Sequence, residues 1–101
     1  MTHYIYIMAN KPFGTLYIGL TSDLKRRIYE HKNGTFEGFT KQYDLKKLVY
    51  YEELSSATQA IQREKTMKHW VRKWKIDLIK KHNPYWRDLA TDWAEYLAFE
   101  D

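Results

Sequence analysis

The stretch Thr15-Leu16-Tyr17-Ile18-Gly19-Leu20 decides how the N-terminal third of this chain is expected to fold. Aliphatic residues alternate in it with Tyr17 and Gly19, and this period of two is typical of a β-strand. The run at 4–8, Tyr-Ile-Tyr-Ile-Met, has the same period and a β-branched and aromatic composition. The residues at 10–14, Asn-Lys-Pro-Phe-Gly, favour a turn. The two runs are therefore predicted to form an antiparallel hairpin.

The register of this hairpin depends on how the turn closes. A symmetric turn places Tyr6 opposite Tyr17 and Tyr4 opposite Gly19. One face of the sheet is then aliphatic and suited to a core, and the other carries tyrosines and is half polar. Because Gly19 has no side chain, open space is expected on the tyrosine face.

The following segment predicts a helix, a loop and a third strand. Ser22 or Thr21 can cap a helix that has Asp23 in its first turn and runs to about Lys32. Residues 35–44 show no clean period and are expected to form a loop. Residues 46–53 are expected to form the third strand.

The C-terminal half predicts helices. Ser56 and Gln59 fit a capping box at the start of a helix, which either continues or breaks near Trp70 before a second helix to about Lys81. Asn83-Pro84 ends the helical region, because the residue before proline avoids the helical conformation. A short last helix is expected at 92–99. The predicted fold class is α+β, an α/β sandwich with a three-stranded antiparallel sheet in the order β-β-α-β-α-α.

Length and composition narrow the class of protein. A chain of 101 residues suits one domain, predicted here as 1–90 with an acidic extension at 91–101. The absence of cysteine excludes disulfides, a cysteine nucleophile and thiolate metal sites. No run approaches the roughly 20 apolar residues of a membrane span, and the apolar start is too short for a signal peptide. A cytoplasmic protein without a membrane partner is expected.

The charge distribution favours an anionic partner. The formal net charge is +4. Eight basic residues lie between Arg63 and Lys81 against two acidic ones, whereas residues 88–101 hold five acidic and no basic residues. This pattern is common in nucleic-acid-binding proteins and nearly as common on plain solvated helices.

Glu64 is the most informative single residue. It falls within the apolar arc that positions 57, 60, 61, 67, 71 and 74 form on a helix. A carboxylate there costs free energy unless it is paired or bound to a cation. One interpretation is a buried salt bridge, for example to Arg27. The other is a metal ligand, since Mg²⁺ can be held by one protein carboxylate with water and phosphate oxygens.

Arg27 and His31 lie four residues apart and hence on one helix face. An arginine beside a metal suits a phosphate, because its planar guanidinium group matches two phosphate oxygens. Each residue alone is more commonly structural or solvated. Tyr6 and Tyr17 alone are more commonly core or surface aromatic residues, and a tyrosine acts as a base only where nearby positive charge lowers its pKa.

Together these residues resemble the GIY-YIG nuclease family in its small single-domain bacterial type, and the chain is similar to the N-terminal catalytic domain of an excision-repair nuclease. The two motifs are Tyr4-Ile5-Tyr6 and Tyr17-Ile18-Gly19, ten residues apart. Arg27 and His31 follow in the expected helix, and Glu64 on a later one. The segment at 83–89, Asn-Pro-Tyr-Trp-Arg-Asp-Leu, is similar to the closing segment of the small members.

The resemblance implies the same three-stranded sandwich and an endonuclease that uses Mg²⁺, or Mn²⁺, to hydrolyse phosphodiester bonds, with branched, damaged and single-stranded DNA as candidate substrates. It implies that Tyr17, with His31 or Tyr6, helps to deprotonate the attacking water. It also implies that Arg27 stabilises charge on the phosphoryl group and that Glu64 holds the metal. The expected substrate-binding residues are Gly19, Arg26, Lys68 and Asn83. No small-molecule cofactor is expected, and the oligomeric state is left open.

Two positions depart from the family pattern, and two other interpretations stay open. Tyr4 stands where the family name has glycine, and Leu20 stands where some relatives carry a lysine. A non-catalytic module could bind nucleic acid with its tyrosine face and basic helices. An interaction protein could have kept the fold alone. The intact set of Tyr17, Arg27 and Glu64 favours the nuclease.

Overall fold

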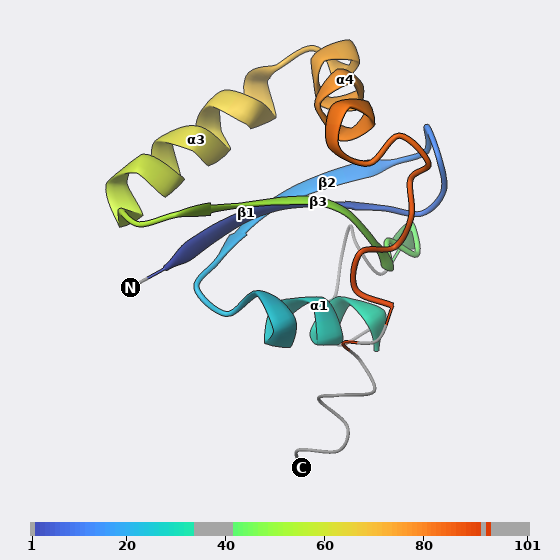
Figure 1. Ribbon diagram of the computed structural model, residues 1–101, viewed down its shortest axis with the longest axis horizontal. Helices are drawn as coiled ribbons and strands as arrows, with labels where there is room; N and C mark the ends of the chain where they lie inside the picture. The colour runs from blue at the N-terminus through green and yellow to red at the C-terminus, as the bar shows by residue number, and fades with distance from the viewer. Residues whose placement is uncertain (1, 34–41, 92, 94–101) are drawn as a thin grey trace.

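The computed structural model describes residues 2–33, 42–91 and 93 of the chain. The strands are β1 (His3–Ala9), β2 (Leu16–Thr21) and β3 (Lys47–Leu54), and the helices are α1 (Leu24–Lys32), α3 (Ala57–His69) and α4 (Arg72–His82). The strands form one antiparallel sheet in the order β2-β1-β3. Helices α3 and α4 lie over one face of the sheet and α1 over the other (Figure 1). The predicted α+β fold and its element order are confirmed.

The hairpin register differs from the predicted one by two residues. Tyr6 lies opposite Gly19, and Tyr17 lies opposite Met8. The reason is the turn, where the Asn10 side chain accepts a hydrogen bond from the backbone N–H of Thr15 at 3.0 Å. Asn10 and Thr15 therefore close the turn, and Ala9 pairs with Leu16.

The tyrosine face is a second core and not the half-polar open surface that was predicted. Tyr6 and Met8 on this face are buried together with Leu24 and Ile28 of α1. The Tyr6 ring packs over Gly19, where a Cβ atom would overlap the ring and its hydroxyl. The expected open space is therefore filled, because α1 covers the face and Tyr6 occupies the gap that the glycine leaves.

The aliphatic face forms a core, as predicted. It packs against α3 and α4, with Ile5, Ile7 and Ile18 buried beside Met67 and Ile79. A β-bulge shapes the β3 side of this core. Ile7 pairs with Tyr50, whereas the next residue of β1 pairs with Leu48. Val49 is thus an extra residue in β3. Val49 and Tyr50 both belong to the core under α3 and α4, whereas Leu48 belongs to the core under α1.

The helix ends follow local side-chain chemistry. Asp23, and not Thr21 or Ser22, caps α1, because its carboxylate accepts from the backbone N–H of Arg26 at 3.3 Å. Thr21 instead accepts from the N–H of Asp23 and shapes the turn before the helix. Ser56 caps α3 as predicted, accepting from Gln59 N–H at 3.3 Å.

The break near Trp70 is present, since Trp70 and Val71 have extended backbone angles between α3 and α4. Asn83 ends α4 as predicted. Most of the predicted loop at 35–44 lies outside the described residues. The same is true of the predicted helix at 92–99 and the acidic extension at 91–101, apart from Thr91 and Trp93. None of the described helices is long and apolar enough to cross a membrane.

The segment after α4 runs back past the sheet to the α1 side (Figure 1). The Asn83 amide donates to the carbonyl oxygens of Val49 and Arg87 at 3.0 and 2.8 Å and accepts from Arg87 N–H. Asp88 pairs with Lys32 of α1 and accepts from Leu48 N–H at 3.2 Å. The segment therefore ties both helical layers to β3.

Candidate active site

Three rings from three elements form the centre of the candidate site. Tyr6 of β1, Tyr17 of β2 and His31 of α1 have ring centroids 5.6 to 6.2 Å apart. The Tyr6 hydroxyl is hydrogen-bonded to His31 Nε2 at 3.0 Å. Tyr6 is fully buried and His31 is 4% exposed, whereas Tyr17 is half-buried. Tyr17 is therefore the member of this cluster that solvent or a ligand can reach.

Electrostatic effects place Arg27 and Glu64 around the same cluster. Burial raises the pKa of the Tyr6 hydroxyl, Tyr17 and Glu64 raise it further, and Arg27 opposes them. Burial lowers the pKa of His31 to about 4, and the positive charge of Arg27 adds to this effect. Both side chains are thus neutral near pH 7. The sequence-predicted residues Tyr6, Tyr17, Arg27 and His31 are brought together, with Glu64 in electrostatic range of Tyr6.

Arg27 and Arg26 differ in their surroundings although they are neighbours on α1. Arg27 is half-buried, and its Nε lies 3.6 Å from a Glu30 carboxylate oxygen. It precedes His31 by one turn, so both side chains lie toward the cluster. Arg26 is exposed. The structure therefore brings Arg27, and not Arg26, into the cluster.

Glu64 lies on α3, where Ala60 and Met67 are buried. Its side chain is 22% exposed, and one carboxylate oxygen lies 3.6 Å from Lys68 Nζ. Glu64 was predicted to fall on the apolar side of the helix. Its carboxylate is mostly shielded from water there, but it is not enclosed. A partly shielded carboxylate with an open edge can bind a cation.

A hollow of about 270 Å³ lies beside Tyr17. Its lining residues come from β2, α3 and α4: Leu16, Tyr17, Ile18, Lys68 and Lys75. Lys68 joins this hollow to Glu64 through the ion pair. Lys75 is a site residue that the sequence motifs did not single out. The basic stretch between Arg63 and Lys81 was the signal that contained it.

The donor set decides which metal site is feasible. Within residues 2–33, 42–91 and 93, no group of three or more His, Asp or Glu side chains could together hold an ion. A divalent ion here would have Glu64 as its protein ligand and oxygens of water and phosphate in the other positions. A hard cation such as Mg²⁺ commonly binds in this way, so the residues present fit it.

Two of the predicted substrate-binding residues, Gly19 and Asn83, are buried and make contacts within the protein. Gly19 is buried and makes room for the Tyr6 ring. Asn83 is buried, and its amide is hydrogen-bonded to the backbone of Val49 and Arg87. These contacts do not support direct substrate binding by either residue. They position β1, β2 and the closing segment instead.

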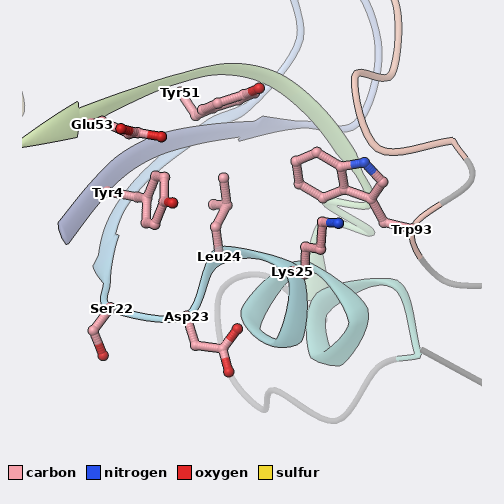
Figure 2. A pocket seen from close by; sticks show the side chains of 8 residues that line it. All are labelled: Tyr4, Ser22, Asp23, Leu24, Lys25, Tyr51, Glu53 and Trp93. Carbon is pink, nitrogen blue, oxygen red and sulfur yellow. The ribbon is translucent and has the colours of Figure 1, made fainter. Parts of the chain in front are cut away.

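A second hollow, of about 310 Å³, lies at the start of α1 (Figure 2). Its lining residues are Tyr4, Ser22, Asp23, Leu24, Lys25, Tyr51, Glu53 and Trp93. The carboxylates of Asp23 and Glu53 outnumber the one ammonium group, and Lys25 Nζ lies 5.8 Å from the centre of the Trp93 ring.

These surroundings argue against base stacking by Tyr4 and Tyr6. Tyr6 is fully buried, and the tyrosines open to this second hollow lie beside carboxylates that repel phosphate. Of the tyrosines on this face, Tyr17 is the one that lies beside lysines and within reach of a ligand.

Comparison with known proteins identifies the family. Residues 2–77 match the GIY-YIG catalytic domain. The chain is 38% identical over 79 residues to the UPF0213 protein SSP2268 of Staphylococcus saprophyticus, covering 78% of this chain and 95% of that protein. It is 35% identical to the UPF0213 protein SAG0778 of Streptococcus agalactiae, covering 78% of this chain and 89% of that protein.

The fold is similar to the solution NMR structure of the UPF0213 protein BH0048 from Bacillus halodurans. The TM-score is 0.56 at 32% identity, over 90% of this chain and 97% of that one. GIY-YIG nucleases generally use divalent metals and act on nucleic acid, so the match points to a nuclease. The chain belongs to the GIY-YIG family.

Proposed function

We propose that this protein is a Mg²⁺-dependent endonuclease that hydrolyses phosphodiester bonds in DNA. The observation that carries the proposal is the convergence of Tyr17, Arg27 and His31 around Tyr6, with Glu64 of α3 in electrostatic range. The hollow beside Tyr17 has two lysines in its lining and so suits a phosphate.

Each residue of the site has a different role in phosphodiester hydrolysis. Water attacks phosphorus, the bond to the leaving oxygen breaks, and the proton of the water passes to a base. Tyr17 is the best-placed base, since its ring lines the hollow together with two lysines. Tyr6 is a poor base, because burial raises its pKa and keeps the phenol protonated. Tyr6 and His31 are therefore assigned as positioning residues that hold Tyr17.

Arg27 and Glu64 act on charge. The guanidinium group of Arg27 stays positive through the reaction and stabilises the negative charge that grows on the phosphoryl oxygens. Glu64 would hold the divalent ion, which when bound polarises the phosphate and lowers the pKa of water. Lys68 keeps the Glu64 carboxylate beside the hollow through its ion pair.

The test uses supercoiled plasmid and labelled single-stranded, branched and duplex DNA with Mg²⁺ or Mn²⁺. Glu64→Gln and Arg27→Ala should each lower the cleavage rate at least about 100-fold, because each removes charge stabilisation in the transition state. Glu53→Gln and Arg87→Ala are matched controls on exposed positions away from the cluster. Circular dichroism should show the same fold for all four variants.

Two outcomes would overturn the proposal. Wild-type cleavage rates in both Glu64→Gln and Arg27→Ala would show that the chemistry lies elsewhere. Binding of DNA by the wild-type protein without cleavage of any substrate would favour a non-catalytic binding module. A labelled RNA of the same sequence is included, and cleavage of RNA alone would contradict the DNA assignment.

A further inference from the structure

The surface where α3 meets α4 carries an exposed tryptophan beside a hollow. The hollow has a volume of about 380 Å³ and is lined by Trp70, Trp74, Asp77, Leu78 and Lys81. Trp74 is 55% exposed although it is one of the largest apolar side chains. The Trp70 and Trp74 rings meet edge to face, with centroids 6.3 Å apart. An exposed aromatic ring beside a hollow commonly marks a binding site.

Trp70, the second tryptophan of this hollow, is contacted by Arg63. The guanidinium carbon of Arg63 lies 5.2 Å from the centre of the Trp70 ring. Arg63 is itself fixed by Glu52, at 2.9 Å between Nε and a carboxylate oxygen. Arg63 thus fixes the position of the Trp70 ring, and Trp74 is the ring that a ligand can reach.

The charge around this hollow suits an anion. Its one carboxylate, Asp77, pairs with Lys73 at 2.8 Å. Among the residues that the structure describes, Lys75 and Lys81 have no carboxylate within salt-bridge distance. The centre of a protein interface is depleted of charge, whereas an aromatic ring among unpaired cations is typical of sites that bind single-stranded nucleic acid.

Lys75 connects this hollow to the candidate active site. It follows Trp74 directly on α4 and lines the hollow beside Tyr17. Consecutive residues of a helix point about 100° apart. The two hollows therefore lie on adjoining sides of α4, so one strand could reach both of them.

We propose that Trp74 stacks an unpaired base of the substrate next to the cleaved phosphodiester, while Lys75 and Lys81 bind the flanking phosphates. The inference rests on the proposed function and adds the substrate class to it. The preferred substrate is then single-stranded DNA, or a branch with unpaired nucleotides, over continuous duplex. In duplex DNA the bases are stacked on one another and offer no free face to Trp74.

The test measures binding by fluorescence anisotropy without divalent ions, so that no cleavage occurs. Labelled single-stranded DNA and its duplex are compared for wild type, Trp74→Ala, Trp74→Phe and the control Tyr85→Ala. Tyr85 is 78% exposed and lies beyond α4. Trp74→Ala should weaken single-strand binding by roughly 5- to 150-fold, the range typical for loss of one stacked base. Trp74→Phe should restore most of the affinity, and duplex binding should change less than about twofold.

The outcomes separate this inference from the proposed function. Equal losses on single strand and duplex, or no loss with Trp74→Ala, would overturn base stacking even if the wild type cleaves DNA. Selective loss of single-strand binding in a protein that cleaves no substrate would support base stacking and overturn the nuclease. A wild-type protein that binds duplex at least as tightly as single strand would also overturn the stated preference.

Discussion

At the residue scale, Tyr6, Gly19 and His31 form one packing unit. The absence of a side chain at Gly19 lets the Tyr6 ring cross from β1 over β2, and the Tyr6 hydroxyl then reaches His31 Nε2. All three residues are buried. The unit fixes the wall against which Tyr17 packs, with ring centroids of Tyr6 and Tyr17 6.2 Å apart. The family motif thus supplies an accessible tyrosine together with the buried support that orients it.

Gly19→Ala tests this packing. Alanine in place of glycine usually stabilises a strand by lowering backbone entropy in the unfolded state. Here the added Cβ would overlap the fully buried Tyr6 ring. We expect a loss of about 1–3 kcal/mol in the free energy of unfolding, measured by urea denaturation. In a Tyr6→Leu background the added cost should shrink, and an unchanged or higher stability of Gly19→Ala alone would contradict this packing.

Because His31 is buried in its neutral form, we expect the folded protein to lose stability in acid. Its pKa is lowered from about 6.5 to about 4 by burial, so the unfolded chain binds a proton more readily than the folded one. The stability that neutral His31 contributes to the folded state is complete above pH 6.5. About 3 kcal/mol of it is lost as the pH falls toward 4. Urea denaturation at several pH values should show this slope.

His31→Gln should flatten the pH dependence of stability between pH 4 and 6.5, because no group titrates at that position. Ile28→Val is a suitable control, since it weakens the same core without removing a titrating group. The control should keep the wild-type slope at a lower stability. A wild-type slope in His31→Gln would assign the acid sensitivity to other groups.

At the scale of elements, caps and one bulge set where side chains point. The Ser56 cap fixes where α3 begins and therefore where Glu64 lies, two turns later on the same helix. The bulge at Val49 changes which residues of β3 point to each core. The extended residues Trp70 and Val71 turn the chain so that α4 can present Lys75 to the hollow beside Tyr17.

Ser56→Ala should destabilise the protein by about 1 kcal/mol, because the backbone N–H of Gln59 loses its acceptor. Chemical denaturation followed by circular dichroism measures this effect. Ser55→Ala is the matched control, an exposed serine one residue earlier, and should change stability by less than about 0.5 kcal/mol. Equal effects of the two substitutions would argue against Ser56 as the cap.

At the scale of the whole molecule, opposite charges are separated on two sides. Lys68 and Lys75 line the hollow beside Tyr17, and Lys81 lines the neighbouring one. The hollow at the start of α1 instead has Asp23 and Glu53 (Figure 2). A polyanion should therefore approach from the side of α3 and α4, where its phosphates meet cations and not carboxylates.

The salt dependence of single-strand binding tests this direction of approach. Each phosphate contact contributes about 0.7 to the slope of log affinity against log salt. The double variant Lys75→Gln/Lys81→Gln should therefore lower the magnitude of the slope by about 1.4. Lys46→Gln/Lys47→Gln, at the start of β3, carries the same change in charge and should leave the slope near the wild-type value. Equal changes in both double variants would indicate that only net charge matters.

Local patterns predicted most of the fold. The alternation in β1 and β2, the cap at Ser56 and the stop at Asn83 each depend on residues close in sequence, so the chain order suffices to find them. The sequence left open whether the helix breaks or continues at Trp70, and the structure shows the break. The register of the hairpin depends on a side-chain hydrogen bond within the turn, and the burial of the tyrosine face depends on contacts with a separate helix. The side chain of Asn10 and the packing of α1 decided them.

For the site, the order and spacing of the family motif identify the residues to consider, which are Tyr17, Arg27, His31 and Glu64. What surrounds these residues follows from the packing of distant segments. The packing buries Tyr6 against Gly19 and His31, and it brings Lys75, from a helix that no motif marked, beside Tyr17. The physical reason is that a pKa or a hollow depends on burial and on neighbouring charges, which only the packing of distant segments creates.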